Sequence, residues 1–278
     1  MKETGAVHVC NMMTTNHTPS VTVFFPAYND ADVIEALVVS ALNTLPNLTS
    51  DYEVLVVDDG SSDDTGLVLE KLAGNQPRLR VIHHPENMGY GGALRSGFAN
   101  ASKELVFYTD GDGQYDPREL LTLWPLMTTG IDVVNGYKLK RADKSHRKVL
   151  GSLYNHMARW FFRLPIRDVD CDFRLMRRHA LDQIELVSSS GIICVELVRK
   201  LHAAGFIFTE APVNHYPRTH GRSQFFTLHS VTSTALDFAL FWWRLVVLRQ
   251  LNSNVTVPKP TNPACEPGQI GTEGLPPV

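Results

Sequence analysis

One acidic stretch brings together side chains that could bind a divalent cation. The stretch YTDGDGQYDP (108–117) follows the apolar run 105–107, and within it Asp110, Asp112 and Gln114 alternate with glycines. If the backbone stays extended, Asp110 and Asp112 point to the same side. Two carboxylates and a neutral oxygen suit Mg²⁺ or Mn²⁺, which leave coordination positions open for phosphate oxygens. The thiol and imidazole groups that zinc prefers are absent from the stretch.

An aspartate- and glycine-rich segment can also be a solvated surface turn. Two other polar stretches argue against that interpretation here. FPAYND (25–30) and VVDDGSSDD (56–64) also end apolar runs that predict strands. Ligands of parallel sheets bind at the carboxyl ends of the strands, so three polar strand ends predict one binding site.

Predicted strands and helices alternate through the first half of the chain. Apolar runs predict five strands, which lie at 21–25, in the segment that begins at 52, and at 79–84, 104–110 and 131–137. Helical spacing predicts helices at 30–45, in the segment that ends at about 72, at 87–101 and at 117–127. Pro125 is expected to end or kink the last of these helices. We therefore expect an α/β fold with a mostly parallel sheet and helices on both faces. A basic amphipathic segment (145–164), a helix at about 192–204 and a strand at 205–209 follow.

Composition narrows the classes of function. The formal net charge is −3, so the chain is not predicted to bind nucleic acid through bulk charge. The four cysteines lack CxxC spacing, which predicts reduced thiols and neither a disulfide framework nor a zinc site. Residues 1–20 contain no apolar signal-peptide core, and no uncharged run reaches the roughly 18–20 residues that span a bilayer. These features predict a cytoplasmic protein.

Four ordered motifs resemble those of family-2 glycosyltransferases with the GT-A fold. They are FPAYNDADVI (25–34), VVDDGSSDDT (56–65), NMGYGGALRSGF (87–98) and YTDGDGQYDP (108–117). FRLMRR (173–178) and the segment 195–223 are similar to dolichyl- and polyprenyl-phosphate sugar transferases, whose best-known members are the dolichol-phosphate mannosyltransferases. The resemblance covers about residues 20–225. It implies a GT-A (Rossmann-like) fold and an inverting transfer of sugar from a GDP- or UDP-linked donor to a polyprenyl or dolichyl phosphate.

The resemblance also implies roles for individual residues. The donor-binding residues would be Pro26, Tyr28, Asp30, Asp58, Asp59, Asp110, Gly111, Lys138 and Arg218. Mg²⁺ or Mn²⁺ would be bound by Asp110, Asp112 and Gln114, so Asp112 would be a catalytic residue, and the cation would neutralise the charge that develops on the leaving nucleoside diphosphate. The loop around Arg218 would be a lid over the donor.

The chemistry of the acceptor decides whether a general base is needed. A phosphate acceptor is already anionic and needs only positioning by cations, for which Lys138, Arg147 and Arg174 are suitable. A saccharide or natural-product hydroxyl would need a base, and Asp172 is the candidate catalytic residue for that hypothesis. Asp172 could equally cap a helix or pair with Arg174 or Arg177. A third hypothesis is a nucleotide-sugar-binding protein without catalytic activity.

The chain is expected to contain four regions. These are a flexible N-terminus (1–20), a GT-A glycosyltransferase domain (21–225), an amphipathic helix that could be membrane-interfacial (226–251) and a disordered tail (252–278).

The segment 233–251 has two interpretations. Its apolar face could close the core, or it could lie in a membrane interface with Phe241, Trp242 and Trp243 at the headgroup level. A lipid acceptor favours the second interpretation. The expected partners are then a nucleotide-sugar donor, a polyprenyl-phosphate lipid, and either a membrane surface or a membrane partner protein, with the chain peripheral at the cytoplasmic face.

Overall fold

The computed structural model describes residues 17–139, 145–218 and 236–247, without the side chains of 145–150, 246 and 247. The predicted tail (252–278), most of the predicted flexible N-terminus and residues 226–235 lie outside the described ranges.

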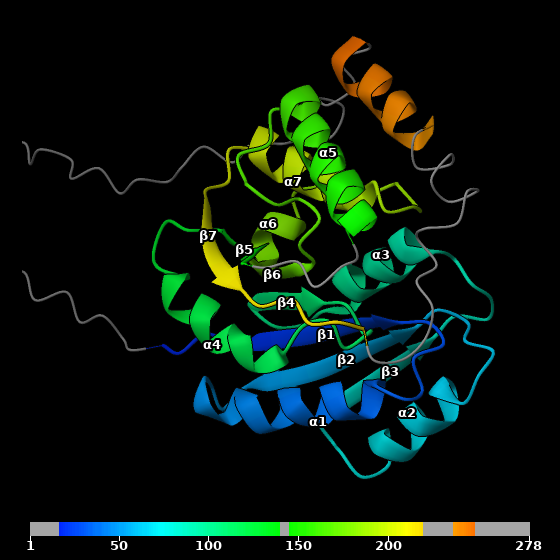
Figure 1. The fold of residues 1–278 in the computed structure, drawn as a ribbon. Coiled ribbons are helices and arrows are strands. Elements are labelled where there is room, and N and C mark those ends of the chain that lie inside the picture. The colour runs from blue at the N-terminus through cyan, green and yellow to red at the C-terminus, as the bar shows by residue number, and fades with distance from the viewer. Residues whose placement is uncertain (1–16, 140–144, 219–235, 248–278) are drawn as a thin grey trace, which may run out of the picture.

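Seven strands form one sheet in the order β3-β2-β1-β4-β6-β5-β7 (Figure 1). The strands are β1 (Val21–Ala27), β2 (Tyr52–Asp58), β3 (Leu79–His83), β4 (Leu105–Thr109), β5 (Val133–Lys138), β6 (Phe173–Arg177) and β7 (Phe208–Val213). β6 runs antiparallel to its neighbours β4 and β5, whereas the other neighbouring pairs are parallel. The prediction of a mostly parallel sheet is therefore confirmed.

Helices cover both faces of the sheet, as predicted. They are α1 (Ile34–Thr44), α2 (Thr65–Ala73), α3 (Tyr90–Asn100), α4 (Leu120–Leu123), α5 (Ser145–Phe162), α6 (Arg178–Leu181) and α7 (Ile193–Ala203). In Figure 1, α1 and α2 lie below the sheet, and α3, α6 and α7 lie above it. One apolar core lies on each face of the sheet, because successive side chains of a strand point to opposite faces. Val23 and Phe25 belong to the core on the α1 side, and Phe24 belongs to the core on the α3 side.

A third apolar cluster joins α5, α7 and the helical residues 236–247. The Phe162 ring on α5 lies 5.0 Å from the ring of Phe238 and 5.3 Å from that of Phe241, measured between centroids. The buried face of the C-terminal helix therefore contributes to a core, which was one of its two interpretations.

The sequence-based prediction missed β6. This strand is buried on both faces although its second residue is Arg174, and an arginine inside a short apolar run conceals a core strand. The last strand covers Phe208–Val213 and not 205–209. The predicted helix 117–127 is the short α4 between two 3₁₀ turns, Pro117–Glu119 and Trp124–Leu126, and Pro125 lies in the second turn, as its helix-breaking character predicted.

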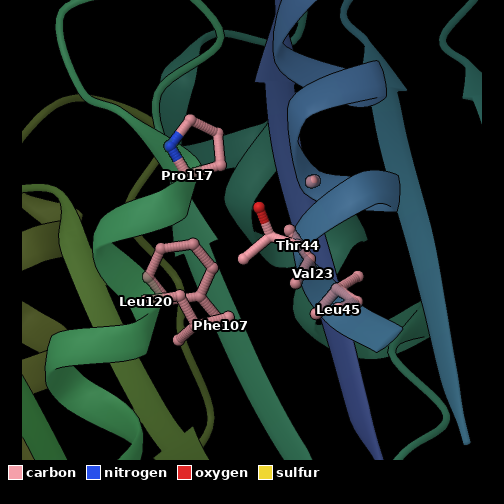
Figure 2. Close-up of a pocket in the computed structure, with 7 residues that line it drawn as sticks. Val23, Thr44, Leu45, Phe107, Pro117 and Leu120 are labelled. Carbon is pink, nitrogen blue, oxygen red and sulfur yellow. The ribbon is translucent and has the colours of Figure 1, made fainter. Parts of the chain in front are cut away.

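A small apolar gap lies between α1 and the sheet (Figure 2). It is lined by Val23, Ala41, Thr44, Leu45, Phe107, Pro117 and Leu120. It has essentially no room for a water molecule, so it is a packing imperfection of the core.

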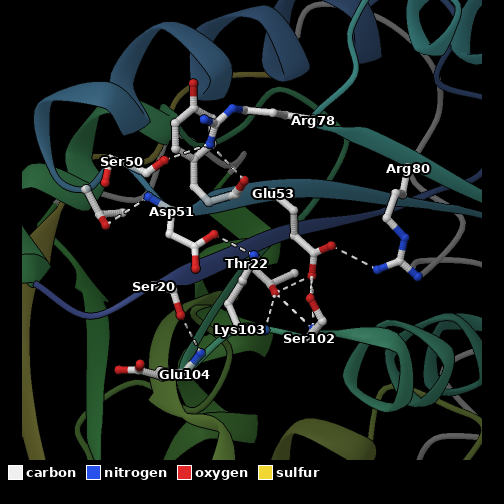
Figure 3. Close-up of polar contacts among 12 residues, drawn as sticks. Ser20, Thr22, Ser50, Asp51, Glu53, Arg78, Arg80, Ser102, Lys103 and Glu104 are labelled. Atoms are coloured by element: carbon white, nitrogen blue, oxygen red, sulfur yellow. Dashed lines mark hydrogen bonds and ion pairs between the residues drawn. The ribbon is translucent and has the colours of Figure 1, made fainter.

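The amino ends of the strands carry a hydrogen-bond network centred on the buried Glu53 of β2 (Figure 3). Its carboxylate accepts hydrogen bonds from Thr22 Oγ1 (2.7 Å), Ser102 N (2.9 Å), Ser102 Oγ (2.8 Å) and Arg80 (2.8 Å). Burial alone would raise the pKa of Glu53, but these hydrogen bonds outweigh it and lower the pKa to about 2. The ionised carboxylate therefore stabilises the contact between β1, β2 and the 102–104 turn.

Glu53 is expected to make the stability of the fold sensitive to acid. Its pKa is lower in the folded chain than the roughly 4.3 of an unfolded glutamate, so its contribution is present above about pH 4.3 and is lost as the pH falls towards 2. In urea unfolding, the stability advantage of the wild type over Glu53→Gln should shrink by about 2 kcal/mol between pH 5.5 and pH 2. The exposed Glu86→Gln variant should show no such change, and a pH-independent difference for Glu53 would contradict the prediction.

Candidate active site

Polar segments follow β1, β2 and β4, which are neighbours in the sheet. Tyr28–Asp30 follow β1, Asp58 and Asp59 lie at the end of β2, and the stretch from Asp110 follows β4. Because these three strands are parallel, their carboxyl ends meet at one edge of the sheet. The structure therefore brings the three polar stretches together, as their positions in the sequence predicted.

Each carboxylate at the end of β2 is paired with a histidine at the end of β3. Asp58 Oδ2 lies 2.8 Å from His83 Nδ1, and Asp59 Oδ1 lies 2.6 Å from His84 Nδ1. Asp59 also accepts a hydrogen bond from Met88 N (2.9 Å), and both aspartates are buried. Neither histidine was predicted to belong to the site. The signal that could have identified them is the parallel register, which pairs an Asp-Asp end with a His-His end.

The turn after β1 is attached to the loop after β2 through Asn29, which the sequence analysis did not single out. Asn29 has a positive φ of 56°, and its Oδ1 accepts a hydrogen bond from Ser62 N (2.8 Å). The next residue, Asp30, accepts a hydrogen bond from Tyr28 N (3.1 Å). Burial and then the negative charge of Asp112 raise the pKa of Asp30 to about 6.

Gly111 allows the chain after β4 to pass close to β1. A Cβ atom at this position would lie 2.5 Å from the Pro26 carbonyl oxygen, so a larger residue would push the two segments apart. This close approach positions the flanking aspartates. Asp110 Oδ1 accepts a hydrogen bond from the hydroxyl of Tyr90 (2.8 Å), another residue that the sequence analysis did not assign, and Asp112 Oδ1 accepts one from Gln114 N (2.9 Å).

The carboxylates at this edge fit a divalent cation. Burial, followed by the negative charges of Asp172 and Asp112, raises the pKa of Asp110 well above its usual range. A cation would offset that repulsion, and the donor set consists of oxygens, which Mg²⁺ and Mn²⁺ prefer. Within the described ranges, no three His, Cys, Asp or Glu side chains form a preformed metal site. Phosphate oxygens of a ligand would therefore have to complete the coordination.

Two of the predicted site residues have partners on the segment 216–218. Arg218 forms an ion pair with Asp112 Oδ2. Gln114 O accepts a hydrogen bond from Tyr216 N (2.9 Å), and Gln114 Nε2 donates one to Tyr216 O (3.2 Å). The segment thus lies directly on the acidic stretch, while the remainder of the predicted lid (219–224) is outside the described residues.

Arg174 lies in the core, which disagrees with its predicted contact to an acceptor phosphate. Its side chain is 0% exposed, and its guanidinium donates hydrogen bonds to Asn135 Oδ1 (2.5 Å), the Tyr108 hydroxyl and the Val169 carbonyl. Its NH1 lies 3.7 Å from Asp172 Oδ1. Arg174 therefore links β4, β5 and β6 from a fully buried position.

Asp172 lies beside this arginine and near the acidic stretch. Its Oδ1 accepts hydrogen bonds from Cys194 Sγ (3.0 Å) and from the Tyr108 hydroxyl (3.3 Å). Burial raises the pKa of Asp172, and the positive charge of Arg174 offsets part of that rise. The ion-pair interpretation of Asp172 is thus compatible with the geometry, and so is a basic carboxylate at the site.

The other two basic residues proposed for the acceptor are Lys138 and Arg147. Lys138, at the end of β5, donates hydrogen bonds to the carbonyl of Asp170 and to its Oδ2 (3.2 Å). Burial raises the pKa values of Asp110 and Asp172, and the positive charge of Lys138 offsets a small part of that rise, so Lys138 belongs to the same electrostatic cluster. Arg147 lies in α5, and its side chain is outside the described part of the chain.

The glycine-rich motif (87–98) packs closely against other elements. A Cβ atom on Gly97 would overlap the ring of Phe24 on β1. Gly91 N donates a hydrogen bond to Ser189 O (2.8 Å), and a Cβ atom on Gly91 would lie within 2.7 Å of Ser189 backbone atoms. The glycines thus allow α3 to approach both the sheet and the 188–189 loop.

Comparison with known proteins identifies the family. Residues 22–185 match the sequence model of a family described as "Glycosyl transferase family 2". The chain belongs to this family. The family-2 enzyme assignment inferred from the four motifs is therefore confirmed.

Curated relatives of this glycosyltransferase include two kinds of sugar transferase. Glycosyltransferase AglD from Haloferax volcanii is 29% identical over 246 residues, which cover 85% of this chain and 39% of that protein. An undecaprenyl-phosphate 4-deoxy-4-formamido-L-arabinose transferase from Aeromonas hydrophila is 29% identical over 212 residues, which cover 76% of this chain and 64% of that protein. The chain thus spans less than two thirds of the length of these relatives.

Solved structures with a similar fold include two transferases. The mannosyltransferase PcManGT from Pyrobaculum calidifontis, in complex with GDP-Man and Mn²⁺, has a TM-score of 0.55 and 24% identity over 75% of this chain and 59% of its own. Glucosyl-3-phosphoglycerate synthase from Mycobacterium tuberculosis, in complex with Mn²⁺, UDP and phosphoglyceric acid, has a TM-score of 0.56 and 20% identity over 87% of this chain and 80% of its own. These likenesses confirm the predicted GT-A fold.

Proposed function

We propose that the chain transfers a sugar, with inversion, from a GDP- or UDP-linked donor to a polyprenyl or dolichyl phosphate. The observation that carries the proposal is the convergence of Asp30, Asp112 and Arg218 beside Asp110 at the carboxyl ends of β1 and β4. Carboxylates and a guanidinium at one sheet edge suit a cation-bound diphosphate. The curated undecaprenyl-phosphate transferase supports the lipid acceptor.

The donor would lie across the ends of β1, β2 and β4. Pro26, Tyr28 and Asp30 would frame the base and ribose, and Asp58 and Asp59, each oriented by a histidine, would recognise the nucleoside. Asp110 and Asp112, with Gln114, would hold Mg²⁺ or Mn²⁺, which supplies charge neutralisation for the leaving nucleoside diphosphate. An acceptor phosphate oxygen attacks the anomeric carbon, and the bond from that carbon to the diphosphate breaks.

Arg218 would change partners when the donor binds. In the structure, its guanidinium forms an ion pair with Asp112. A donor diphosphate offers Arg218 an alternative anion, and the released Asp112 carboxylate can then face the cation. The exchange would also draw the segment 216–218 onto the donor, consistent with the predicted lid.

The acceptor phosphate would be positioned by Lys138 and Arg147. Arg174 would act indirectly, because its hydrogen bonds to Tyr108 and Val169 hold the loop that carries Asp172. The catalytic domain of the proposed enzyme corresponds to residues 21–225. A lipid acceptor further implies that the enzyme works peripherally at the cytoplasmic face of a membrane, alone or with a membrane partner protein.

A hydroxyl acceptor is the second candidate, and the environment of Asp172 favours it. Burial raises the pKa of this carboxyl, which makes its ionised form a stronger base than an ordinary aspartate. In that case Asp172 would take the proton from the attacking hydroxyl of a saccharide or natural product.

The proposal is tested with a panel of nucleotide sugars, Mg²⁺ or Mn²⁺, and a short-chain polyprenyl phosphate, with the lipid product identified by mass. We expect a glycosylated polyprenyl phosphate with at least one GDP- or UDP-sugar. Turnover only with saccharide or other hydroxyl acceptors would replace the proposal by the second candidate. Donor binding without turnover on any acceptor would indicate a non-catalytic nucleotide-sugar-binding protein.

Asp172→Asn separates the two enzymatic hypotheses. For a phosphate acceptor, turnover should remain within about ten-fold of the wild type, since no base is needed. A loss of several hundred-fold with unchanged donor binding would instead favour a hydroxyl acceptor. Asp182→Asn, on the exposed end of α6, is the matched control and should be neutral.

A further inference from the structure

α5 exposes an apolar stripe on the side that faces away from its own core. Leu153, Met157 and Trp160 are exposed, and Trp160 is 76% exposed. Their spacing of four and three residues places them on one side of the helix. The buried residues Ala158 and Phe162 lie on the opposite side, where α5 packs against α7. The stripe is therefore not covered by the part of the chain that the structure describes.

The C-terminal helix repeats this arrangement. Leu236, Leu240 and Trp243 are exposed, again four and three residues apart, and Trp243 is 53% exposed. Phe241 and Leu245 are buried on the opposite side. Of the three aromatic residues predicted to reach a headgroup region, Phe241 thus lies in the core, and Trp242 packs 5.9 Å from the ring of Phe161. Trp243 alone of the three is exposed outward.

The two helices pack against each other, so the stripes belong to neighbouring elements. The rings of Phe161 and Phe238 lie 5.9 Å apart, and those of Tyr154 and Phe238 lie 6.1 Å apart. Figure 1 shows α5 above the sheet, with the orange C-terminal helix beside it and farther from the sheet. We call the six exposed side chains of the two stripes the two-helix surface: Leu153, Met157, Trp160, Leu236, Leu240 and Trp243.

Arginines without a carboxylate partner flank the two-helix surface. Within the described residues, Arg159, Arg163 and Arg244 are exposed and take part in no ion pair. Arg163 directly follows α5 and has a positive φ of 51°. The pKa of Arg199 on α7 is lowered first by the burial of Arg199 and then by the positive charge of Arg163. The acidic residue on the described part of these two helices is Asp237. The surface therefore combines apolar and cationic side chains.

We propose that the two-helix surface docks the enzyme onto an anionic lipid bilayer. Tryptophan and leucine side chains on the outer sides of two packed helices insert at the headgroup level, and the flanking arginines bind lipid phosphates. Arginines that lack a carboxylate within the chain complement an anionic bilayer. No helix among the described residues is long and apolar enough to cross a membrane. The inference rests on the proposed function in one respect, since a lipid acceptor explains why the enzyme needs such a surface.

The test is sedimentation of the full chain with vesicles, without donor or acceptor. Vesicles of about 30% phosphatidylglycerol in phosphatidylcholine should sediment the wild type and shift its tryptophan fluorescence to the blue. Trp160→Gln/Trp243→Gln should weaken binding at least about five-fold, because the apolar insertion is lost. Arg159→Gln/Arg163→Gln should remove most of the preference over pure phosphatidylcholine vesicles. The altered side chains are exposed, so circular dichroism should show unchanged folding.

The control is Leu67→Gln/Leu121→Gln, which alters two exposed leucines on α2 and α4 and should bind as the wild type does. Equal vesicle binding by the tryptophan variant and this control would overturn the proposal. A second result would also overturn the proposal: the wild type does not bind vesicles but forms a concentration-dependent dimer, and the tryptophan variant does not form that dimer. The two-helix surface would then join two copies of the chain.

Assays with a water-soluble, short-chain polyprenyl phosphate separate this inference from the proposed function. Vesicle binding that depends on Trp160 and Trp243 supports the docking surface even if no acceptor is glycosylated, and then only the proposed function fails. Turnover of the soluble acceptor without any vesicle binding overturns the docking surface and leaves the proposed function standing.

Discussion

Replacing Asp112 with alanine is expected to lower turnover at least about 1,000-fold, the largest effect on activity that we predict. The variant loses a carboxylate proposed to bind the cation, and it releases Arg218 from its ion pair. The fold should persist, because removal of Asp112 also removes repulsion that raises the pKa values of Asp30 and Asp110. Turnover should be measured over a Mg²⁺ and Mn²⁺ titration, since a weakened metal site requires more metal.

The matched control for this prediction is Asp116→Ala. Asp116 belongs to the same acidic stretch, but its carboxylate pairs with the exposed Arg118 and caps the turn Pro117–Glu119. Its loss should change turnover less than about three-fold, with a small cost in stability. Near-normal turnover of Asp112→Ala would refute the metal assignment, and equal losses in both variants would point to a general collapse of the stretch.

Arg174→Met should lower the free energy of unfolding by about 3–5 kcal/mol, the largest effect on stability that we predict. Methionine retains much of the side-chain volume but leaves Asn135 Oδ1, the Tyr108 hydroxyl and the Val169 carbonyl without their donor. It also leaves the largely buried Asp172 carboxylate without its neighbouring positive charge. Urea unfolding followed by circular dichroism measures the change.

Arg178→Met is the control for the core arginine. Arg178 is exposed, and its guanidinium lies 3.9 Å from Asp182, so its loss should cost less than about 1 kcal/mol. If Arg174→Met were no less stable than Arg178→Met, Arg174 would not be the buried link between β4, β5 and β6, and its predicted role at the acceptor phosphate would return.

The strand ends were predictable because their signals are local. A buried strand is an apolar run, and the first polar residues after it necessarily lie at its end. Asp30, Asp58 and Asp110 were therefore predicted to lie at one edge as soon as the sheet was expected to be parallel. The same reasoning failed for β6, because a buried arginine interrupts the apolar run, and its antiparallel pairing depends on residues far away in the sequence.

The partners of the site residues were not predictable in the same way. The contacts of Asp59 with His84 and of Asp110 with Tyr90 join residues 25 and 20 positions apart, and each depends on the register of strands or on the approach of α3. Any of the many polar residues in the chain could have supplied these groups. Their identity requires the packed structure.

Which elements form and which chemical groups follow them depend on the order of neighbouring residues, so both could be predicted from the sequence. What two residues of the same type do depends on how the chain packs around them. Arg174 and Arg218 both lie near acidic residues. Arg174 is buried among three strands, whereas Arg218 forms an ion pair with Asp112 at the candidate active site. Phe241 and Trp243 likewise face opposite ways on one helix. Burial is set by what packs around a side chain, and those neighbours come from distant parts of the chain.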